Sequence, residues 1–449
     1  MPPEAGGLTR RLSELVGGEH LLGGPAAAGF AVDGSTPLLV VRPGTQQEVE
    51  AVVAACAEVG AAIGPRGGGT AVGLGNPPAR LDVVVCLDRL TRIVEFDPAN
   101  LVVSAEAGVR LADLQRVLAA EREFLPLDPP RMDRRTVGGV IASNASGPSR
   151  LLYGTARDLV LGLRVVLPSG ERVRCGGKVI KNVSGYDMNK VFIGSLGTLG
   201  IITEATFKLL PAPAGRATVA GVFADLPRAA AVVTRALESF LLPEGMELLD
   251  PQALAAVAPG LGLEGSGGYG LAVAVAGSQE TVERQARDFT QLLSEGTAIR
   301  TNRLGPEASL AAWRGIRDLP DRLLGSEGVA VKIGVPISRT APFLASAEDL
   351  ARRHGWRVAI AAHAGSGVVR AVYAAGAAAP EVVRDGVEAL RREAEAAEGS
   401  LVVEAAPAAL KRHLDAWGKT GEGFAVMRRL KAEFDPRGLM NPGRFLGGI

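Results

Sequence analysis

Small residues and polar residues are interspersed through residues 136–147, a pattern suited to holding a large ligand. The sequence there is Thr136-Val-Gly-Gly-Val-Ile-Ala-Ser-Asn-Ala-Ser-Gly147, and it follows Pro129-Pro130 closely. Glycines let backbone N–H groups approach a diphosphate, and apolar Val and Ile neighbours can pack a flat ring. Tight turns of an ordinary α/β domain are the alternative interpretation, and one glycine cluster alone does not decide between the two.

A second glycine run, Arg66-Gly-Gly-Gly-Thr70, follows a predicted strand at Ala62–Pro65. No Lys-Ser/Thr pair follows Gly73, so the run is not a Walker A loop. It is also a poor Rossmann fingerprint, because the glycine spacing fails at Val72 and no helix pattern opens directly behind it. Adjacent N–H groups can still form an anion-binding nest, and Arg66 is expected to make a local contact within the loop.

Two further segments of this kind lie later in the chain. Residues 194–203, Gly-Ser-Leu-Gly-Thr-Leu-Gly-Ile-Ile-Thr, are again rich in small residues, and residues 435–445 form a dense run of turn residues. Terminal segments are commonly loose. A turn run at 435–445 therefore predicts a segment that is fixed against a ligand.

Helices and strands must position these loops. We expect an amphipathic helix over Leu8–Leu22 and a helix that begins after Thr45, with Glu48 completing a capping box. Beyond Pro211-Ala-Pro213, strands alternate with helices, which suggests an antiparallel sheet with helices on one face. The 449 residues are thus predicted to form an α+β fold with a first domain at 1–213, a second at 214–413, and a segment at 414–449 that returns to the first.

Composition excludes several classes of function. The three cysteines, Cys56, Cys86 and Cys175, form no C-x-x-C pair, so neither an iron–sulfur cluster nor a Cys-type zinc site is expected. A net charge of +1 with 22% charged residues indicates neither nucleic-acid binding nor a polybasic membrane patch. Because no apolar stretch is long enough to span a bilayer and the first residues lack a signal-peptide pattern, we expect a cytoplasmic protein.

Four motifs in one order resemble the FAD-linked oxidase family, whose flavin domain is of the vanillyl-alcohol-oxidase type. They are Pro65-Arg-Gly-Gly-Gly-Thr70, the 136–147 run, the 194–203 run and Asn441-Pro-Gly-Arg444. The resemblance covers nearly the whole chain. Within the family, Lys181-Asn-Val-Ser-Gly-Tyr-Asp187 and the Gly-Ser-Leu-Gly form at 194–197 look most like FAD-binding subunits of bacterial glycolate oxidases, with FAD-linked D-lactate dehydrogenases as near relatives.

The resemblance implies a PCMH-type FAD-binding domain of two subdomains and a cap domain for the substrate. Gly67–Thr70 and Gly138-Gly139 would embrace the FAD pyrophosphate, and Asn441 would lie near the flavin ring. Thr70 stands where some relatives have a His attached covalently to the flavin, so non-covalent FAD is implied. The residues expected to bind FAD are Pro65, Arg66, Gly67, Gly68, Gly69, Thr70, Thr136, Gly138, Gly139, Ser143, Asn144, Gly147, Tyr153, Gly197, Gly200, Ile201, Ile202 and Asn441.

The implied reaction is oxidation of a small 2-hydroxy acid, glycolate or D-lactate, to the 2-oxo acid by hydride transfer to flavin N5. Arg317 and Lys332 match the family's carboxylate-binding cations; ordinary salt bridges are the alternative. His363 is the candidate base, tuned by Glu404. The alternative for His363 is a structural histidine.

The chain departs from the family's pattern at a metal site, where relatives often have His-x-Gly-Asp-Gly-Asn-x-His followed later by Glu-His-Gly. Arg370 replaces the second His, and Ala405 follows Glu404. A His/Glu pair beside an Arg cation is a poor divalent-metal site, so we expect no metal. The absence of these two histidines also suggests a second hypothesis, in which the chain is a non-catalytic FAD-carrying subunit that conducts electrons or scaffolds a complex. A sister flavoprotein would then oxidise the substrate, and an iron–sulfur subunit would be a further partner.

Overall fold

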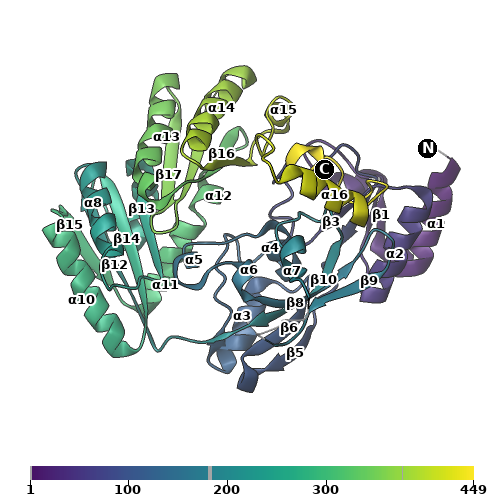
Figure 1. The fold of residues 1–449 in the computed structure, drawn as a ribbon, viewed down its shortest axis with the longest axis horizontal. Helices are drawn as coiled ribbons and strands as arrows, with labels where there is room; N and C mark the ends of the chain where they lie inside the picture. Colours follow the sequence, from purple (N-terminus) through teal and green to yellow (C-terminus); the bar gives the residue numbers. More distant parts are fainter. Residues whose placement is uncertain (1–2, 180–184, 377) are drawn as a thin grey trace. The chain divides into compact units, whose positions relative to one another are not determined.

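The computed structural model describes residues 3–179, 185–376 and 378–449 and divides into two compact units (Figure 1). Unit 1 comprises Met1–Ala145, Thr155–Ala212 and Lys419–Ile449, whereas unit 2 comprises Ser146–Gly154 and Pro213–Gly418. The first residues of the motif that begins at Lys181 lie outside the described residues. The segment from 419 onwards is part of unit 1, the unit that contains the glycine runs at 66–70 and 194–203.

One sheet of unit 1 has four strands in the order β1-β2-β4-β3. Strands β2 and β3 run parallel to β4, and β1 runs antiparallel to β2. Its apolar side chains pack with those of α1 and α2 in one hydrophobic core. The bounds are β1 Leu21–Gly23, β2 Leu39–Val41, β3 Ile63–Arg66, β4 Val83–Cys86, α1 Pro3–Val16 and α2 Gln46–Val59.

The second sheet of unit 1 is antiparallel, in the order β5-β6-β10-β8-β9. Apolar residues from its strands pack against α3 and α4 in a separate core. The bounds are β5 Ile93–Asp97, β6 Val102–Glu106, β8 Val160–Val166, β9 Arg172–Gly176, β10 Ile201–Lys208, α3 Leu111–Ala120 and α4 Val137–Ser143; the remaining elements are α6 Ala156–Leu159, α7 Asn189–Phe192, α16 Phe424–Phe434 and a two-stranded ladder of β7 Glu123–Phe124 with β11 Leu210–Pro211.

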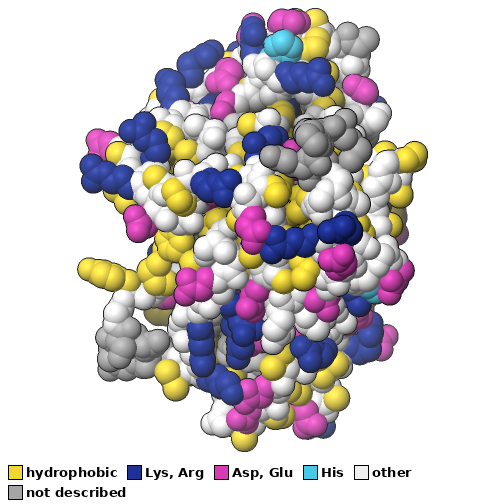
Figure 2. All heavy atoms as spheres, turned by 90° about the vertical axis from the view of Figure 1, so that its right-hand side faces the viewer, with side chains coloured by type: hydrophobic (Ala, Val, Ile, Leu, Met, Phe, Trp, Pro, Cys, Tyr) yellow, Lys and Arg dark blue, Asp and Glu magenta, His cyan; other side chains and the backbone are white. Residues whose placement is uncertain are grey.

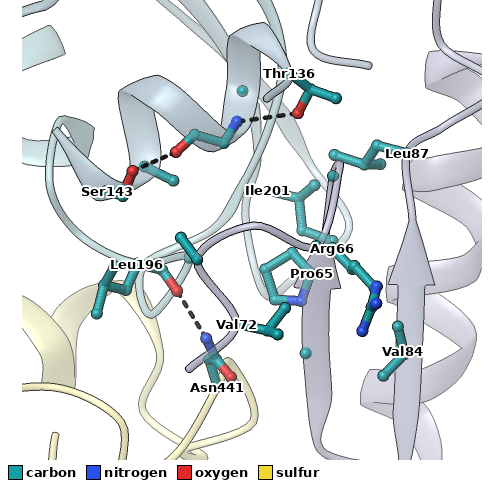
Figure 3. A pocket seen from close by; sticks show the side chains of 18 of the residues that line it. Pro65, Arg66, Val72, Val84, Leu87, Thr136, Ser143, Leu196, Ile201 and Asn441 are labelled. Carbon is teal, nitrogen blue, oxygen red and sulfur yellow. Dashed lines mark hydrogen bonds between the residues drawn. The ribbon is translucent and has the colours of Figure 1, made fainter. Parts of the chain in front are cut away.

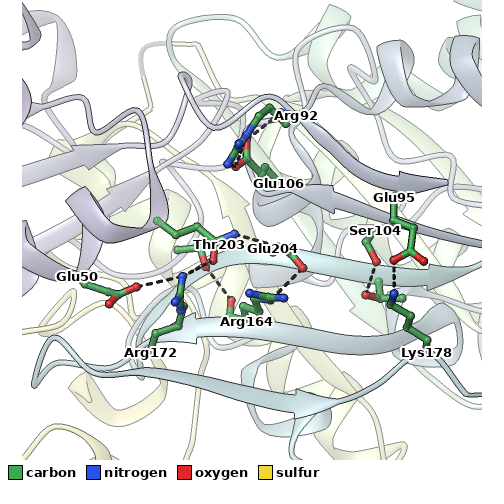
Figure 4. A network of polar contacts seen from close by, with 12 residues as sticks. Glu50, Arg92, Glu95, Ser104, Glu106, Arg164, Arg172, Lys178, Thr203 and Glu204 are labelled. Atoms are coloured by element: carbon green, nitrogen blue, oxygen red, sulfur yellow. Dashed lines mark hydrogen bonds and ion pairs between the residues drawn. The ribbon is translucent and has the colours of Figure 1, made fainter.

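Polar side chains on this second sheet form a network of ion pairs (Figure 4). Arg164 Nε lies 3.0 Å from Glu204 Oε1, and Gln46 donates a hydrogen bond to Glu204 Oε2 at 2.8 Å. Arg92 lies 2.7 Å from the carboxylate of the fully buried Glu106. Opposite charges therefore compensate the burial of both carboxylates, as a buried charge requires.

Unit 2 is built on an eight-stranded antiparallel sheet, in the order β15-β12-β14-β13-β17-β18-β16-β19. The large core on one face includes side chains of α8, α10, α13 and α14, and a second core on the other face includes α9, α11 and α12. The strand bounds are β12 Gly215–Phe223, β13 Gly245–Leu249, β14 Tyr269–Gly277, β15 Arg300–Leu304, β16 Gly328–Gly334, β17 Arg357–His363, β18 Val368–Ala374 and β19 Ser400–Ala405. The helix bounds are α5 Arg150–Tyr153, α8 Leu226–Leu237, α9 Pro251–Leu261, α10 Gln279–Glu295, α11 Pro306–Arg317, α12 Leu319–Leu323, α13 Thr340–His354, α14 Pro380–Ala396 and α15 Ala408–Lys411.

The predicted α+β class and the antiparallel sheet of the second unit are confirmed, with the addition that helices cover parts of both sheet faces. The predicted helix at Leu8–Leu22 is wrong at its end, because α1 stops at Val16 before Gly17, whose φ of +86° is not helical. Thr45 does cap α2, accepting from Glu48 N at 3.1 Å, but the Glu48 carboxylate accepts from Gly44 N instead of the cap residue.

The described surface agrees with the near-neutral composition. On the face drawn in Figure 2, basic and acidic side chains are interspersed. Within the described ranges, no helix is long and apolar enough to cross a membrane.

Candidate functional site

Unit 1 contains a cleft whose walls come from segments far apart in the sequence (Figure 3). It holds about 1010 Å³ of space not filled by atoms, its open mouth included. Of the residues predicted to bind FAD, those that line the cleft are Pro65, Arg66, Gly67, Gly68, Gly69, Thr70, Thr136, Gly138, Gly139, Ser143, Gly197, Gly200, Ile201, Ile202 and Asn441. Residues from all four motifs therefore meet at this cleft, although the 136–147 run contributes only its part up to Ser143.

The glycines at 67 and 68 permit close packing between two loops. A Cβ on Gly67 would lie 2.2 Å from Thr136 Oγ1, and one on Gly68 would lie 1.8 Å from the Arg134 carbonyl oxygen. Both distances are far below any van der Waals contact, so only glycine fits at either position. Residues 66–70 are therefore pressed against the segment that leads into α4.

Gly139 is less crowded than these glycines, although a Cβ there would still make one tight contact. A Cβ there would meet nothing nearer than Thr136 Oγ1, at 3.2 Å. Thr136 caps α4 and accepts a hydrogen bond from Gly139 N at 3.4 Å, while Ser143 Oγ donates to Gly139 O at 2.6 Å (Figure 3). This backbone face can be approached closely by a ligand that a side chain would exclude.

The C-terminal turn run is fixed beside the cleft by specific contacts. Asn441 Nδ2 donates to Leu196 O at 2.7 Å, and Asn441 N donates to Ile63 O at 2.8 Å. Buried Lys431 donates to Thr198 O at 2.7 Å and pairs with Asp435 at 2.6 Å. Burial lowers the pKa of Lys431 below its ordinary value, and Asp435 opposes that shift. The run at 435–445 is therefore tied down by protein contacts, and its predicted contact with a ligand stays a prediction.

Arg444 lines the cleft but was not among the residues predicted to bind there. Its buried guanidinium pairs with Asp33 at 2.9 Å and donates to the carbonyl oxygens of Asn76 at 2.6 Å, Val72 and Leu74. Burial lowers the pKa of Arg444, and Asp33 opposes the shift. The sequence signal was present, since Arg444 ends the motif that begins at Asn441.

Apolar side chains supply much of the remaining wall, and sequence patterns did not identify them. Among them are Phe30, Val32, Val72, Leu74, Leu81, Val84, Leu87 and Leu196. The Arg66 guanidinium lies over the Phe30 ring at 4.9 Å from its centre, a contact with a residue outside the loop in which Arg66 was expected to make its contact. Open glycine backbone and polar caps beside an apolar wall fit a cofactor with a diphosphate and a flat ring, which is the chemistry of FAD.

Three residues predicted to bind FAD do not line this cleft. Asn144 ends α4 in the left-handed conformation, with φ of +45°, so it terminates the helix. Gly147 and Tyr153 belong to unit 2, and Tyr153 closes the short helix α5. Burial is the main cause that raises the pKa of Tyr153 to about 12, and Glu244 adds to it.

The predicted substrate residues Lys332 and His363 lie on one face of the unit 2 sheet. Lys332 is directly opposite Arg370 on β18, Arg370 is opposite Ala361 on β17, and His363 follows two residues after Ala361. Cross-strand partners share a face, and so do residues two apart on one strand. The sheet register therefore gathers Lys332, Arg370 and His363 onto the same surface.

Lys332 and Arg370 place two cations side by side. Burial lowers the pKa of Lys332 below its ordinary value, and the Glu404 carboxylate opposes this shift. The Arg370 and Arg150 cations add to the lowering. Arg370 Nε lies 3.6 Å from Glu404 Oε2, and Arg370 also donates to the carbonyl oxygen of Ser146 at 3.3 Å.

Glu404, which was predicted to tune His363, makes no direct contact with it among the contacts that these two side chains form here. His363 Nδ1 instead contacts the carboxylate of Glu247, its cross-strand partner on β13, while Glu404 pairs with Arg370. Strands β18 and β16 separate β17 from β19, so Glu404 is three strand spacings away, about 14 Å. Among the residues described, no group of three or more His, Cys, Asp or Glu side chains is arranged to hold a metal ion.

Arg317 lies at the end of α11, where its Nε donates to Asp318 Oδ1 at 3.1 Å. Its side chain is 14% exposed. Its predicted role in binding a carboxylate stays a prediction.

Comparisons with known proteins agree with this architecture. A family model described as "FAD binding domain" matches residues 37–176, and one described as "FAD linked oxidases, C-terminal domain" matches residues 212–445. The "Glycolate oxidase subunit GlcD" of Bacillus subtilis is 31% identical over 425 residues, which cover 91% of this chain and 89% of that protein. A "D-lactate dehydrogenase" of Anaerostipes hadrus is 31% identical over 344 residues, which cover 74% of this chain and 72% of that protein.

Solved structures show the same fold. The 4-ethylphenol oxidase of Gulosibacter chungangensis matches with a TM-score of 0.77 over 99% of this chain and 97% of that one, at 15% identity. At that identity the likeness shows the fold alone. The family match over 212–445 and the identity to the Bacillus subtilis protein show more: this chain is a flavoprotein of the FAD-linked oxidase family, and its cofactor is FAD.

Proposed function

We propose that this FAD-linked oxidoreductase oxidises a small 2-hydroxy acid, glycolate or D-lactate, to the 2-oxo acid, as a subunit of a glycolate oxidase-like complex. One observation carries the proposal, namely the adjacent cations of Lys332 and Arg370 on the unit 2 sheet. Two neighbouring cations with one carboxylate nearby form a surface suited to a substrate carboxylate. The names of two relatives, a glycolate oxidase subunit and a D-lactate dehydrogenase, support the same class of substrate.

In this proposal the residues of the chain bind the substrate and move one proton. Lys332 and Arg370 hold the carboxylate, with Arg317 as a further candidate, and His363 accepts the hydroxyl proton. When bound, FAD supplies the acceptor for the hydride that leaves the substrate's α-carbon. The hydroxyl oxygen then forms the double bond of the 2-oxo acid.

We further propose that FAD is held without a covalent bond. The glycine loop that lines the cleft ends in Thr70, at the position where some relatives have a His bonded to the flavin. Thr70 has no imidazole to form that bond. Acid precipitation of the purified protein should release all the yellow colour into the supernatant. Flavin that remains in the pellet would contradict this proposal.

An anaerobic absorbance titration tests the reaction. We expect D-lactate or glycolate to bleach the oxidised-flavin band of the purified chain. Lys332→Met should require about 10- to 100-fold more substrate for the same bleaching, because a charged hydrogen bond to the carboxylate is lost. Arg357→Met is the matched control, since it removes an exposed cation at the start of β17.

A flavin band that neither acid bleaches would contradict the proposal. It would favour the second candidate function, an FAD-carrying subunit whose sister subunit oxidises the substrate. The pairing of Arg370 with Glu404 favours that candidate, because a guanidinium that already pairs with a carboxylate of the protein is less available to bind a substrate carboxylate. Co-purification of a second flavoprotein and an iron–sulfur protein with the tagged chain would then support it.

A further inference from the structure

A buried acid–imidazole pair lies on the unit 2 sheet beside the cations. Glu247 on β13 and His363 on β17 are directly opposite each other, and a Glu247 carboxylate oxygen contacts His363 Nδ1. The Glu247 side chain is 1% exposed and that of His363 is 6% exposed. An ionised carboxylate only accepts hydrogen bonds, so Nδ1 of the imidazole is the protonated nitrogen in this contact.

The second ring nitrogen of His363 is in a different situation. Its Nε2 is buried, and within the described residues it has no hydrogen-bond partner. A buried polar atom without a partner is destabilising, so such an atom in a folded protein calls for an explanation. With Nδ1 protonated, Nε2 of the neutral ring has its lone pair available to accept a proton.

We propose that Glu247 is a positioning residue that holds His363 in the Nδ1–H tautomer, so that Nε2 is the atom that accepts the substrate's hydroxyl proton. This inference rests on the proposed function. In the step, the O–H bond breaks and its proton goes to Nε2, while the oxygen electron pair forms the C=O bond as hydride leaves the α-carbon for the oxidised FAD that the protein would hold. The Glu247 carboxylate stabilises the imidazolium that forms, as the carboxylate of a catalytic triad stabilises its histidine.

The tautomer can be observed directly because the chain has only four histidines. We would label the holoprotein with ¹⁵N-histidine and record long-range ¹H–¹⁵N spectra, with His363→Asn to identify the His363 signals. The wild type should show Nδ1 protonated and Nε2 unprotonated. Glu247→Gln retains a carbonyl oxygen and should keep this tautomer, whereas Glu247→Leu should give an Nε2–H signal. An Nε2–H form in the wild type, or an unchanged spectrum of Glu247→Leu, would overturn the inference.

Kinetics test the positioning role separately. Glu247→Gln should lower kcat for hydroxy-acid oxidation about 10- to 100-fold, as loss of a supporting residue commonly does, while KM changes little. The matched control is Glu348→Gln, a partly buried carboxylate on α13 of unit 2, which accepts a hydrogen bond from the Tyr269 hydroxyl at 2.8 Å and should leave both kcat and the tautomer unchanged. An unchanged kcat in Glu247→Gln would overturn the stabilisation of the His363 imidazolium by the Glu247 carboxylate. If no form of the protein oxidises any hydroxy acid, the proposed function fails, and the spectra still decide the tautomer.

Discussion

Arg444 and Asp33 form a buried ion pair across 411 residues of sequence, with their atoms 2.9 Å apart. The Arg444 side chain is 4% exposed and that of Asp33 is 8% exposed. The same guanidinium donates to carbonyl oxygens of the 72–76 loop, part of which lines the cleft predicted to bind FAD. One side chain near the end of the chain therefore holds a wall of this cleft.

Replacing Arg444 with Met should destabilise unit 1 and weaken FAD binding together. The change leaves the Asp33 carboxylate buried without this cation, which is expected to lower the free energy of unfolding by about 3–5 kcal/mol. Denaturant unfolding and the flavin-to-protein ratio measure the two effects. Arg437→Met is the control, because Arg437 is an exposed residue of the same segment. Equal stability of the two variants would contradict this role for Arg444.

Gly139→Asp should abolish FAD binding. The new carboxylate would stand beside Thr136 at the start of α4, where like charge against the diphosphate costs several kcal/mol, or about 100-fold or more in affinity. Flavin absorbance of the purified variant and its titration with FAD are the measurements. Gly139→Ala adds only a Cβ and should retain most of the flavin. Full flavin content in Gly139→Asp would show that the FAD diphosphate does not lie beside Gly139.

Arg317→Ala tests the third predicted carboxylate cation. If Arg317 binds the substrate, kcat/KM should fall about 10- to 100-fold with unchanged flavin content, since a charged hydrogen bond is worth about 1.5–3 kcal/mol. Arg314→Ala is the matched control, an exposed residue of the same helix α11. The same kcat/KM in both variants would remove Arg317 from the substrate site.

Asp250 should make the stability of the protein depend on pH. Burial raises the pKa of this helix-capping carboxyl to about 7, although hydrogen bonds from the Ile360 and Ala253 amides oppose the shift. A folded pKa above the unfolded value means that the native state binds the proton more tightly. The stabilising contribution is therefore fully present below about pH 4 and is lost as the pH rises through about 7.

The measurement is the free energy of unfolding of wild type and Asp250→Asn at pH 5 and pH 8. The wild type should lose about 1–3 kcal/mol more than the variant over this interval. Asp225→Asn is the control, because Asp225 caps α8 in the same way but at the surface. Parallel pH dependences of wild type and Asp250→Asn would show that Asp250 does not titrate in this range.

The sequence alone predicted most elements of both units, because capping residues, glycines and apolar periodicity are local signals. Among the elements that it did not predict are α4, β9, α9 and β15. The helix α9 contains Pro259 and Gly260, although Asp250 and Pro251 form a regular helix start. Strand β15 is an edge strand of the sheet, and residues 300–304 are mostly polar, so they lack the alternation that marks a strand.

The glycine motifs and the terminal Asn441 motif were sufficient to identify the family and its cofactor, since the residues of each motif and their order can be read directly from the sequence. Only the tertiary structure decided which charged side chains are paired. Strand order places β13 beside β17, so Glu247 meets His363 across 116 residues, and it places β19 beside β16, so Glu404 reaches Arg370. An alternating pattern tells which face a side chain occupies, but strand order determines its neighbours, and the whole sheet must fold to set that order.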